Sequence, residues 1–315
     1  MKIAAIQMLA KLADVEANLK IAERLGSEAF TKGAELVVLP EFFTSAMASH
    51  PKMLDAVRSI DGCPMQLLKT LARKHHGIVG GSFIALRGEE SYNTFVLAFP
   101  DGSTYLHDKD QPTMWENCYY IGGTDDGLFQ TPVGHIGVAL CWEFVRTRTV
   151  KRLLGRVDII VGGSCWWTTP TESHLPGFSP KIHEQNTEIM HETPSKFARM
   201  LGVPVIHAAH AGDFEGEMPG MPNIPYKSYY LGETQIVDGS GKILAHLSRE
   251  EGEGIIMAEF DLTQKWTPSE PIPEGFWIPK LPQQLLQTWQ FLNKHGENYY
   301  RNVTKPYRAK HPVLD

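Results

Sequence analysis

The sequence predicts an α/β protein folded as a four-layer α-β-β-α sandwich, in which two mixed sheets stack face to face between outer helices. Two observations predict this fold. Short continuous apolar runs, typical of buried strands, alternate with helical patterns. The order strand, helix, strand, helix, strand, hairpin also occurs twice, as a repeat of architecture and not of sequence. Two such α/β layers bury their apolar faces by stacking sheet on sheet.

The first half of the chain supplies the first set of elements. Residues 3–8 form an expected buried strand, and Asp14 caps a helix whose apolar residues keep a helical spacing until Gly33 ends it. The short apolar strand "ELVVLPE" follows. A second helix begins at Pro64 and stops near Gly77, before the strand "GIVGGSFIAL" and the hairpin "NTFVLAF-PDGS-TYLHDK".

The second half repeats this order. "HIGVALC" predicts a strand, "VRTRTVKRLL" a helix and "VDIIVGG" a strand, followed by a helix with Pro194 near its first turn. The strand "PVIHAA", the hairpin "ETQIVD-GSG-KILAHL" and the strand "GIIMAEFDL" complete the set. We assign residues 1–262 to this domain. Residues 263–315 form a C-terminal extension that is too aromatic for a disordered tail, and we expect it to pack on the body or on a partner subunit.

Two long segments have no clear periodicity. Residues 166–193 and the Gly-, Pro- and Met-rich residues 211–228 are both predicted to be loops. Loops of this length in a compact domain are usually functional lids or disordered segments. We therefore expect residues 166–193 to form a lid, whose histidines contact substrate.

Composition excludes several classes of protein. The chain has 315 residues, 42% hydrophobic and 21% charged, with a formal net charge of −6 and no basic stripe, which argues against a nucleic-acid binder. No apolar run is long enough for a signal peptide or a membrane helix, so we expect a cytoplasmic protein. Four cysteines without C-x-x-C spacing suggest neither a disulfide framework nor a zinc site, and we expect no metal and no cofactor.

Cys141 and Glu41 each end an apolar run. A cysteine on a strand is most often core filler, but Cys141 lies where a strand passes into a helix, and at such corners α/β proteins place ligands. Backbone N–H groups that open a helix favour a thiolate, so a nucleophile is the second interpretation. Glu41 is either a solvated loop residue or, between apolar neighbours, a carboxyl group with a raised pKa suited to general base work.

Lys109 and Glu116 lie together in "HDKDQPTMWENCYYIGG". A lysine at the end of a strand is more often a solvated charge than a catalyst. Here Pro112, Trp115 and Tyr119 indicate a shaped and partly buried loop, in which a cation and a carboxylate are expected to pair.

The order Glu41, Lys109, Cys141, each at the carboxyl end of a predicted strand, resembles the nitrilase superfamily of carbon–nitrogen hydrolases. The resemblance covers residues 1–262. "AAIQM" is similar to the opening strand of that family, "GAELVVLPEFF" to its glutamate motif and "YNTFVLAFPDGSTYLHDKDQPT" to its lysine hairpin. "GHIGVALCWEF" resembles the cysteine elbow, and "GETQIVDGSGKILAHLSREEGEGIIMAEFDL" the closing strands.

The resemblance implies a role for each residue. Cys141 is the nucleophile, Glu41 the general base and acid, and Lys109 stabilises the oxyanion together with the backbone N–H of Trp142. Glu116 matches a second glutamate of the family that holds the lysine and positions the substrate. A thiol needs a base beside it because the thiolate is the attacking form. The resemblance also implies a homodimer or a larger homo-oligomer.

The substrate class is less defined. "KDQPTMWE" and "CWE" resemble the nitrile-cleaving branch, whereas "HDKDQ" and "PSKFARMLGVPVIHAAHAG" depart from it. We favour a small amide or carbamoyl compound, with a nitrile as the alternative. A group of aromatic residues is expected either to line a pocket for a bulky substrate or to pack in the core: Trp115, Tyr119, Tyr120, Trp142, Trp166 and Trp167. Glu143 has no assigned role.

Three rival interpretations fit less well. A Cys-His-Glu glutaminase with His207 or His210 as base needs small residues beside the cysteine, where Leu140 and Trp142 stand. The two histidines of "HAAH" alternate on a strand and point to opposite faces, so they are not expected to share a metal. A non-catalytic scaffold has no reason to keep three intact catalytic positions. Selective inactivation by iodoacetamide at Cys141 distinguishes the enzyme from the scaffold.

Overall fold

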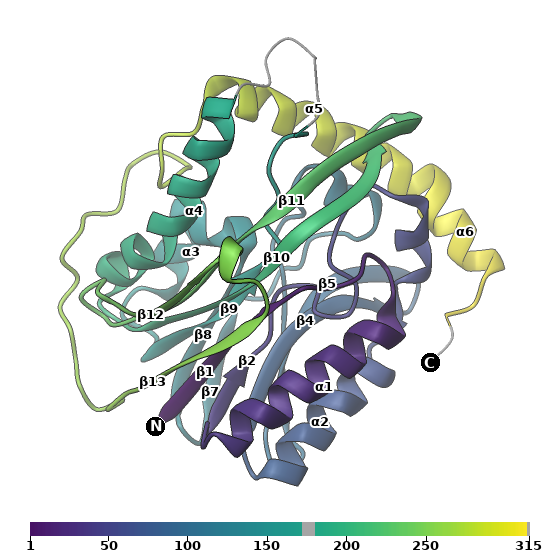
Figure 1. Ribbon diagram of the computed structural model, residues 1–315. Coiled ribbons are helices and arrows are strands. Elements are labelled where there is room, and N and C mark those ends of the chain that lie inside the picture. Colours follow the sequence, from purple (N-terminus) through teal and green to yellow (C-terminus); the bar gives the residue numbers. More distant parts are fainter. Residues whose placement is uncertain (172–179, 314–315) are drawn as a thin grey trace.

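The computed structural model describes residues 1–171 and 180–313 of a mixed α/β protein (Figure 1). The strands are β1 (Lys2–Met8), β2 (Leu36–Val38), β3 (Arg58–Ser59), β4 (Ile78–Arg87), β5 (Glu90–Ala98), β6 (Thr104–Asp108), β7 (Leu128–Thr131), β8 (Gly134–Leu140), β9 (Ile159–Ser164), β10 (Val205–Met218), β11 (Met221–Val237), β12 (Ile243–Ser248) and β13 (Gly254–Glu259). The α-helices are α1 (Val15–Thr31), α2 (Cys63–His75), α3 (Thr147–Leu153), α4 (Pro180–Leu201), α5 (Gln283–Tyr299) and α6 (Lys305–Lys310).

Short helical turns connect several of these elements. They are η1 (Pro51–Asp55), η2 (Met114–Cys118), η3 (Cys141–Val145) and η4 (Arg249–Glu251), all 3₁₀ turns, and the π-helical η5 (Tyr300–Thr304). Of these turns, η3 begins at Cys141, and η2 begins one short loop after Lys109.

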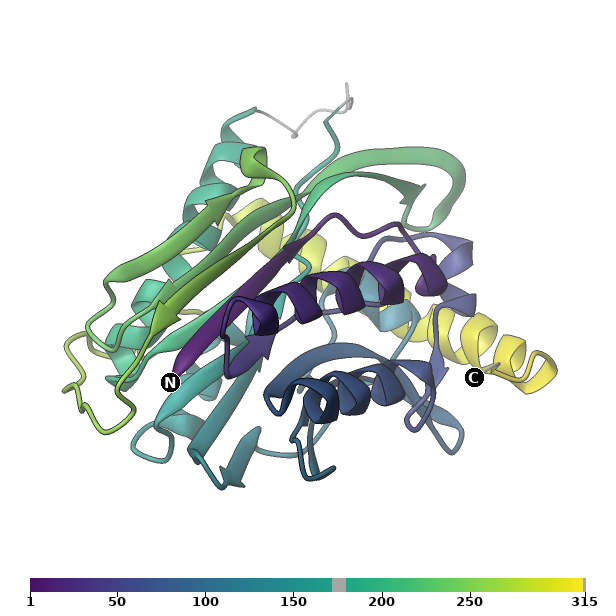
Figure 2. The same ribbon diagram turned by 60° about the horizontal axis from the view of Figure 1, so that its bottom comes forward.

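The strands form one hydrogen-bonded network with the order β6-β5-β4-β2-β1-β10-β9-β8-β7. Its two halves are joined by the parallel pairing of β1 with β10. Helices α1 and α2 cover one half, and α3 and α4 cover the other (Figures 1 and 2). Between the halves lies an apolar core to which both contribute, with Ala5 and Val38 from one half and Val138 and Val161 from the other. The mixed α/β architecture agrees with the sequence, and the division into two separate stacked sheets stays a prediction.

Most elements expected from sequence are confirmed. Asp14 caps α1 through its side chain, which accepts a hydrogen bond from the backbone N–H of Ala17 at 3.1 Å. Gly33 follows the helix with φ of +89°, a conformation that favours glycine. Both hairpins are present, as β5–β6 and β11–β12, and the last strand β13 pairs antiparallel with β1.

The helix around Pro194 was placed wrongly. It begins at Pro180 and runs to Leu201, so Pro194 lies inside it and not near its first turn. The buried positions include polar Asn186 and Thr193 as well as apolar side chains, and this interrupts the periodicity that reveals a helix. Of the predicted lid, residues 172–179 lie outside the described residues.

The loop expected at residues 211–228 is also wrong. These residues belong to the long antiparallel hairpin of β10 and β11, which turns at Pro219 and Gly220. Glycine and proline lower β propensity, so the segment did not resemble a strand. Stacked aromatic rings compensate, because Phe214 lies 4.6 Å from Tyr230 between ring centroids and also stacks on Tyr226.

Helix α5 of the C-terminal extension packs on η2 (yellow in Figure 1). The backbone N–H of Met114 donates to Asn293 Oδ1 at 2.8 Å, and Thr304 Oγ1 donates to the carbonyl of Cys118 at 2.5 Å. The extension therefore supports the loop that carries Glu116, while the domain boundary at residue 262 stays a prediction.

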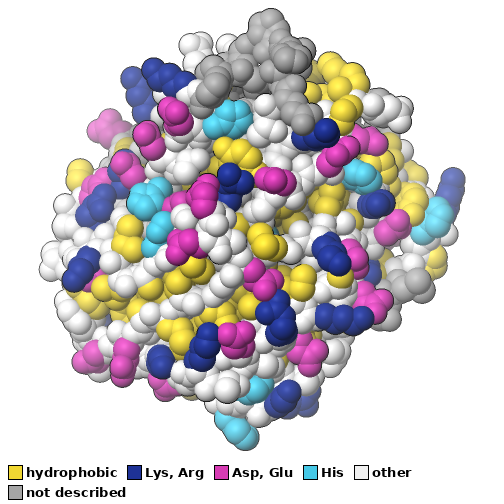
Figure 3. All heavy atoms as spheres, in the orientation of Figure 1, with side chains coloured by type: hydrophobic (Ala, Val, Ile, Leu, Met, Phe, Trp, Pro, Cys, Tyr) yellow, Lys and Arg dark blue, Asp and Glu magenta, His cyan; other side chains and the backbone are white. Residues whose placement is uncertain are grey.

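The surface carries charges of both signs. Figure 3 shows Lys and Arg side chains mixed with Asp and Glu over the face drawn there. Among the described residues, no helix has the length and the apolar character needed to cross a membrane.

Candidate active site

The structure brings together the residues that sequence placed at three strand ends. Glu41 follows β2, Lys109 follows β6 directly, and Cys141 follows β8 directly. Glu116 lies in η2, one short loop after Lys109. These strands end at a common edge of the fold, so side chains that are up to 100 positions apart in the sequence meet there.

The four side chains form one buried cluster. Lys109 Nζ lies 2.9 Å from Glu41 Oε1 and 2.7 Å from Glu116 Oε2, and all three side chains are fully buried. The sulfur of Cys141 and carboxylate oxygens of Glu41 and Glu116 lie within 4.8 Å of one another. The arrangement therefore places a nucleophilic atom, a base and a cation within the reach of one small reacting group.

Neighbouring groups fix the carboxylates. Asn93 Nδ2 donates to Glu41 Oε1 at 2.8 Å, and the backbone N–H of Cys165 donates to Glu41 Oε2 at 2.9 Å. The hydroxyl of Tyr120 donates to Glu116 Oε2. With these contacts and the ion pairs to Lys109, both carboxylates are held in defined orientations. Sequence reasoning missed Asn93 and Cys165; the only signal for Asn93 was a polar residue at the start of the apolar run "NTFVLAF".

The charges of the cluster follow from burial and pairing. Burial raises the pKa of Glu41 to about 7, against the attraction of the Lys109 ammonium. Burial alone would lower the pKa of Lys109, but Glu116 and Glu41 together raise it above its ordinary value. Near neutral pH, Lys109 is therefore charged, and Glu41 exchanges a proton readily. The pKa expected for Glu41 from its apolar neighbours in the sequence has the same direction.

The thiol of Cys141 differs from the expectation. We expected the N–H groups of a following helix to favour the thiolate, but burial and the charge of Glu41 raise the pKa of Cys141 well above its usual value. Cys141 is the first residue of η3, a turn of five residues that has little dipole to oppose burial. Cys141 has φ of +49°, a strained conformation for a residue other than glycine, which presents its side chain at the corner.

Glu143, which had no role in the sequence analysis, connects the cysteine turn to the lysine strand. Its carboxylate accepts from the backbone N–H of Leu140 at 2.9 Å and from that of Asp110 at 3.0 Å, and it lies 3.0 Å from His107 Nε2. Against the effect of burial, Glu143 and Asp125 raise the pKa of His107 to about 10. The pair is therefore charged, and it fixes the residues on either side of Cys141 relative to those on either side of Lys109.

An apolar cavity of about 220 Å³ opens onto Cys141. The four tryptophans that sequence named as pocket candidates, Trp115, Trp142, Trp166 and Trp167, all line it. Trp115 stacks on Trp167 at 4.2 Å between ring centroids. The other described lining residues come mainly from four elements, α4, β10, β11 and α5: Thr113, Met114, Thr168, Thr169, Ile182, Asn186, Met218, Pro219, Met221, Tyr226, Pro282, Leu285, Thr288, Phe291 and Leu292. No charged side chain is among the described lining residues.

The remaining candidate residues lie elsewhere. Tyr119 exchanges hydrogen bonds with the backbone of His50, and Tyr120 bonds to Glu116, so neither lines the described cavity. His207 Nε2 lies 2.8 Å from Ser164 Oγ, and His210 Nε2 lies 2.8 Å from the carbonyl of Glu41. The carboxylates of Glu41 and Glu116 both lie within 4.8 Å of the Cys141 sulfur. This arrangement disfavours a glutaminase with a histidine base.

The α/β fold and this site together define a member of the nitrilase superfamily. The sequence model of the carbon–nitrogen hydrolase family matches residues 2–267, and the chain belongs to that family. It is 23% identical to an N-carbamoylputrescine amidase of Arabidopsis thaliana, over 79% of this chain and 83% of the relative. It is 29% identical to a bifunctional nitrilase/nitrile hydratase of Lupinus angustifolius, over 79% and 74%.

The fold is shared with solved structures. A carbon–nitrogen hydrolase from Helicobacter pylori G27 superimposes with a TM-score of 0.68 at 16% identity, covering 98% of this chain and 97% of the other. At this identity the likeness concerns the fold and not the substrate.

Proposed function

We propose that the protein hydrolyses the carbon–nitrogen bond of a small, uncharged and apolar amide through a thioester on Cys141, releasing ammonia or an amine. The observation that carries the proposal is the position of Cys141, which lines an apolar cavity and lies within 4.8 Å of the buried Glu41 carboxylate. A thiol, a base and a cation in one buried cluster match the needs of acyl transfer.

In the first step Glu41 acts as general base. The raised pKa of Cys141 keeps the proton on sulfur in the free enzyme, so attack on the carbonyl carbon transfers that proton to Glu41. A carbon–sulfur bond forms, and the carbonyl oxygen becomes an oxyanion. The ammonium of Lys109 and the backbone N–H of Trp142, which donates toward the Cys141 sulfur in the resting site, stabilise that charge.

The second half of the cycle reverses the proton transfer. Glu41 returns its proton to the departing nitrogen, the carbon–nitrogen bond breaks, and the acyl group remains on Cys141 as a thioester. Water then gives a proton to Glu41 and attacks the thioester to form a second tetrahedral intermediate. The carbon–sulfur bond breaks, the carboxylic acid leaves, and Glu41 returns the proton to the Cys141 sulfur, which restores the thiol and the carboxylate. Glu116 acts by positioning Lys109, from which its carboxylate lies 2.7 Å away.

The cavity supports an uncharged substrate. A carboxylate or an ammonium group bound against the described walls would lose its water without gaining an opposite charge, which is strongly unfavourable. N-carbamoylputrescine, named for the plant relative, carries an amine that is cationic at neutral pH. The tryptophans of the wall favour an aryl or branched alkyl group in its place.

A nitrile is the second candidate. The spacing of Lys109, Pro112, Thr113 and Glu116 resembles that of the nitrile-cleaving branch, and the lupin relative is named a nitrilase. Attack of the Cys141 sulfur on a nitrile carbon gives a thioimidate, to which water adds before ammonia leaves. The same thioester follows, so the two substrates share the later steps.

A screen of ammonia release tests the proposal. The panel contains phenylpropionamide and phenylpropionitrile, a pair of neutral apolar substrates of similar size. It also contains charged substrates, namely N-carbamoyl amino acids and N-carbamoylputrescine. We expect turnover of a neutral member, an at least ~10⁴-fold loss in Cys141→Ala, as for removal of a catalytic nucleophile, and an unchanged rate in Cys63→Ser. Turnover of the charged substrates alone would refute the apolar preference, and full activity of Cys141→Ala would refute the mechanism.

A further inference from the structure

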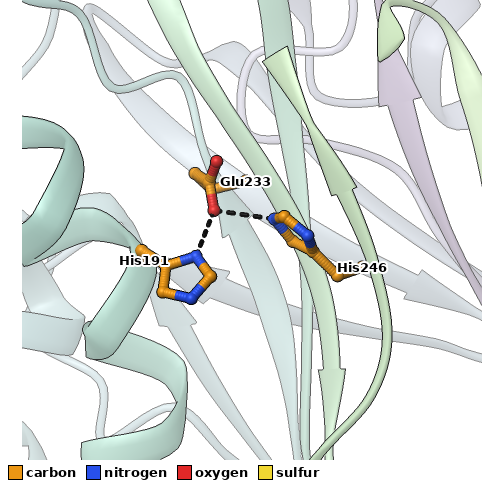
Figure 4. Close-up of side chains that lie close together, drawn as sticks. All are labelled: His191, Glu233 and His246. Atoms are coloured by element: carbon orange, nitrogen blue, oxygen red, sulfur yellow. Dashed lines mark hydrogen bonds and ion pairs between the residues drawn. The ribbon is translucent and has the colours of Figure 1, made fainter. Parts of the chain in front are cut away.

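A second cluster of ligand-type side chains lies outside the active site. His191 of α4, Glu233 of β11 and His246 of β12 meet at one point (Figure 4). His191 Nδ1 lies 2.6 Å and His246 Nε2 lies 2.7 Å from the same oxygen, Oε2 of Glu233. The two imidazoles reach this oxygen from different sides, with ring planes at 90° and centroids 5.2 Å apart.

A β-bulge directs Glu233 to this point. The pairing of β11 with β12 passes from Gly232 to Thr234 with a shift of register, so Glu233 is left out of the ladder. Gly232 and Glu233 have φ of +70° and +64°, and the second value is strained for a residue with a Cβ. Bulges re-aim a side chain at sites where the regular pleat would point it elsewhere. The sheet thus deviates locally to present this carboxylate to the two histidines.

The surroundings hold the cluster in place. Glu233 is only 6% exposed, so its carboxylate is largely removed from water. Gln235, fully buried and paired across the ladder with His246, donates its amide to the carbonyl of His191 at 2.9 Å. This contact fixes the turn of α4 that carries His191 against the strand that carries Glu233. Orientation of ligands by neighbouring hydrogen bonds is a common property of metal sites.

The donor set is that of a transition-metal site. Two imidazole nitrogens and one carboxylate oxygen suit Zn²⁺ and chemically similar divalent ions, and they leave one tetrahedral position free. Ligand atoms of a tetrahedral Zn²⁺ lie about 3.3 Å apart, so each histidine has to withdraw from the carboxylate by roughly 0.6–0.7 Å. His191 and His246, with side chains 46% and 27% exposed, have the freedom for this movement.

A cavity of about 510 Å³ adjoins the cluster and includes His191 and Glu233 in its lining. Glu184, Glu188 and Glu192 of α4 line it as well, which makes it a negatively charged space beside the proposed ligands. Such a space attracts a divalent cation and offers room for water in the free position.

We propose that His191, Glu233 and His246 bind Zn²⁺ or a similar divalent transition metal, with water as the fourth ligand. The ion ties α4 to the β11–β12 hairpin. Because Ile182 and Asn186, near the start of α4, line the active-site cavity, the ion stabilises one wall of that cavity from a distance. The site does not depend on the proposed hydrolysis. The sequence analysis found no metal site because these ligands are spread over more than 50 positions without a recognisable motif.

Metal binding to the full chain tests the site. Protein treated with a chelator is titrated with ZnCl₂ by calorimetry, in a Cys141→Ala background so that the catalytic thiol contributes no ligand. We expect one equivalent to bind, and a rise in Tm on binding. His191→Ala, His246→Ala and Glu233→Gln each remove that equivalent and the rise in Tm. The matched control is His135→Ala, which removes a surface histidine 3.4 Å from Asp158 and keeps the equivalent.

Cobalt provides a second readout. Co²⁺ bound by two histidines and a carboxylate gives the visible absorption of a tetrahedral ion without a thiolate charge-transfer band. Absence of binding in the parent protein would overturn the proposal, as would one equivalent kept by all three ligand variants. A thiolate band in the Co²⁺ complex would also overturn it, because it would place the ion at a cysteine.

Discussion

The floor and the walls of the active site have opposite physical character. The floor consists of Glu41, Lys109 and Glu116, fully buried ionisable groups beside Cys141. The described walls are apolar and uncharged, and α4, the β10–β11 hairpin and α5 of the C-terminal extension build most of them. In the proposed mechanism the floor provides the chemistry, because its charges act at short range in a dry site. The walls would select the substrate, because a charged group bound against them finds no opposite charge. On this proposal, reaction type and substrate choice are encoded in different parts of the chain.

The largest effect on the floor is expected from Glu41→Gln. The amide keeps the shape of the side chain but cannot accept the proton of Cys141, so kcat should fall by about 10²–10⁴-fold, the range for loss of a general base. Steady-state kinetics with a neutral amide measure this. Glu23→Gln, which changes an exposed glutamate of α1, serves as the control and keeps the parental rate. A Glu41→Gln variant within a factor of two of the parent would remove Glu41 from the reaction.

Glu143→Gln tests whether the floor depends on the contacts of the Glu143 carboxylate with His107 and with the backbone of Leu140 and Asp110. The change removes the fully buried partner of cationic His107, which keeps its ion pair with the partly exposed Asp125. The free energy of unfolding should therefore fall by about 3 kcal/mol. If Glu143 positions Cys141 against Lys109, kcat falls while KM changes little. Urea denaturation and kinetics check both.

The matched control for Glu143→Gln is Glu253→Gln. It breaks an ion pair with Arg24 at the surface, where such pairs contribute at most about 1 kcal/mol. Equal losses of stability in the two variants, or an unchanged kcat in Glu143→Gln, would contradict the assigned role.

A change in the wall should alter selectivity and not chemistry. Trp167→Ala removes the ring that stacks on Trp115, so kcat/KM for an aryl amide should fall by about 10-fold, the scale of one lost apolar contact. For a short amide such as propionamide the value should change little. Trp266→Ala, outside the described cavity lining, leaves both substrates unaffected. Equal losses on both amides would show that the wall also shapes the floor.

The smallest effect concerns pH. Glu41 must be deprotonated to act as base, so kcat/KM should rise with pH through an inflection near its pKa of about 7. The negative charge of Glu116 contributes to raising that pKa, and Glu116→Gln should therefore move the inflection to lower pH. An inflection that stays in place or moves upward would assign it to a different group.

The floor was largely predictable from sequence and the walls were not. Glu41, Lys109 and Cys141 each follow the end of a strand, and strand ends follow from local apolar patterns. The cavity depends on contacts between segments far apart in the chain, such as Leu292 of α5 with the residues around Trp115. Such contacts leave no local pattern.

Two local errors have the same origin. The start of α4 and the strands of the β10–β11 hairpin were missed because tertiary packing overrides local preference there. Asn186 is buried on the helix and donates to the carbonyl of Trp167 at 3.1 Å, while Pro225 pairs within the hairpin opposite Glu217. Asparagine has a low helix propensity and proline a low strand propensity. In the fold, the contacts of Asn186 with Trp167 and of Pro225 with the opposite strand offset these local preferences. Glu143 likewise had no role until the structure showed its contacts with His107 and Asp110.

Mass spectrometry of the covalent intermediate tests the central claim most directly. The enzyme is mixed with a neutral aryl amide, quenched in acid during turnover, and digested for peptide mapping. We predict a mass increase equal to the acyl group minus one hydrogen, located on Cys141, that decays when substrate is exhausted and is absent in Cys141→Ala. Continued turnover with no adduct on Cys141, or an adduct on Cys165 in its place, would contradict the account.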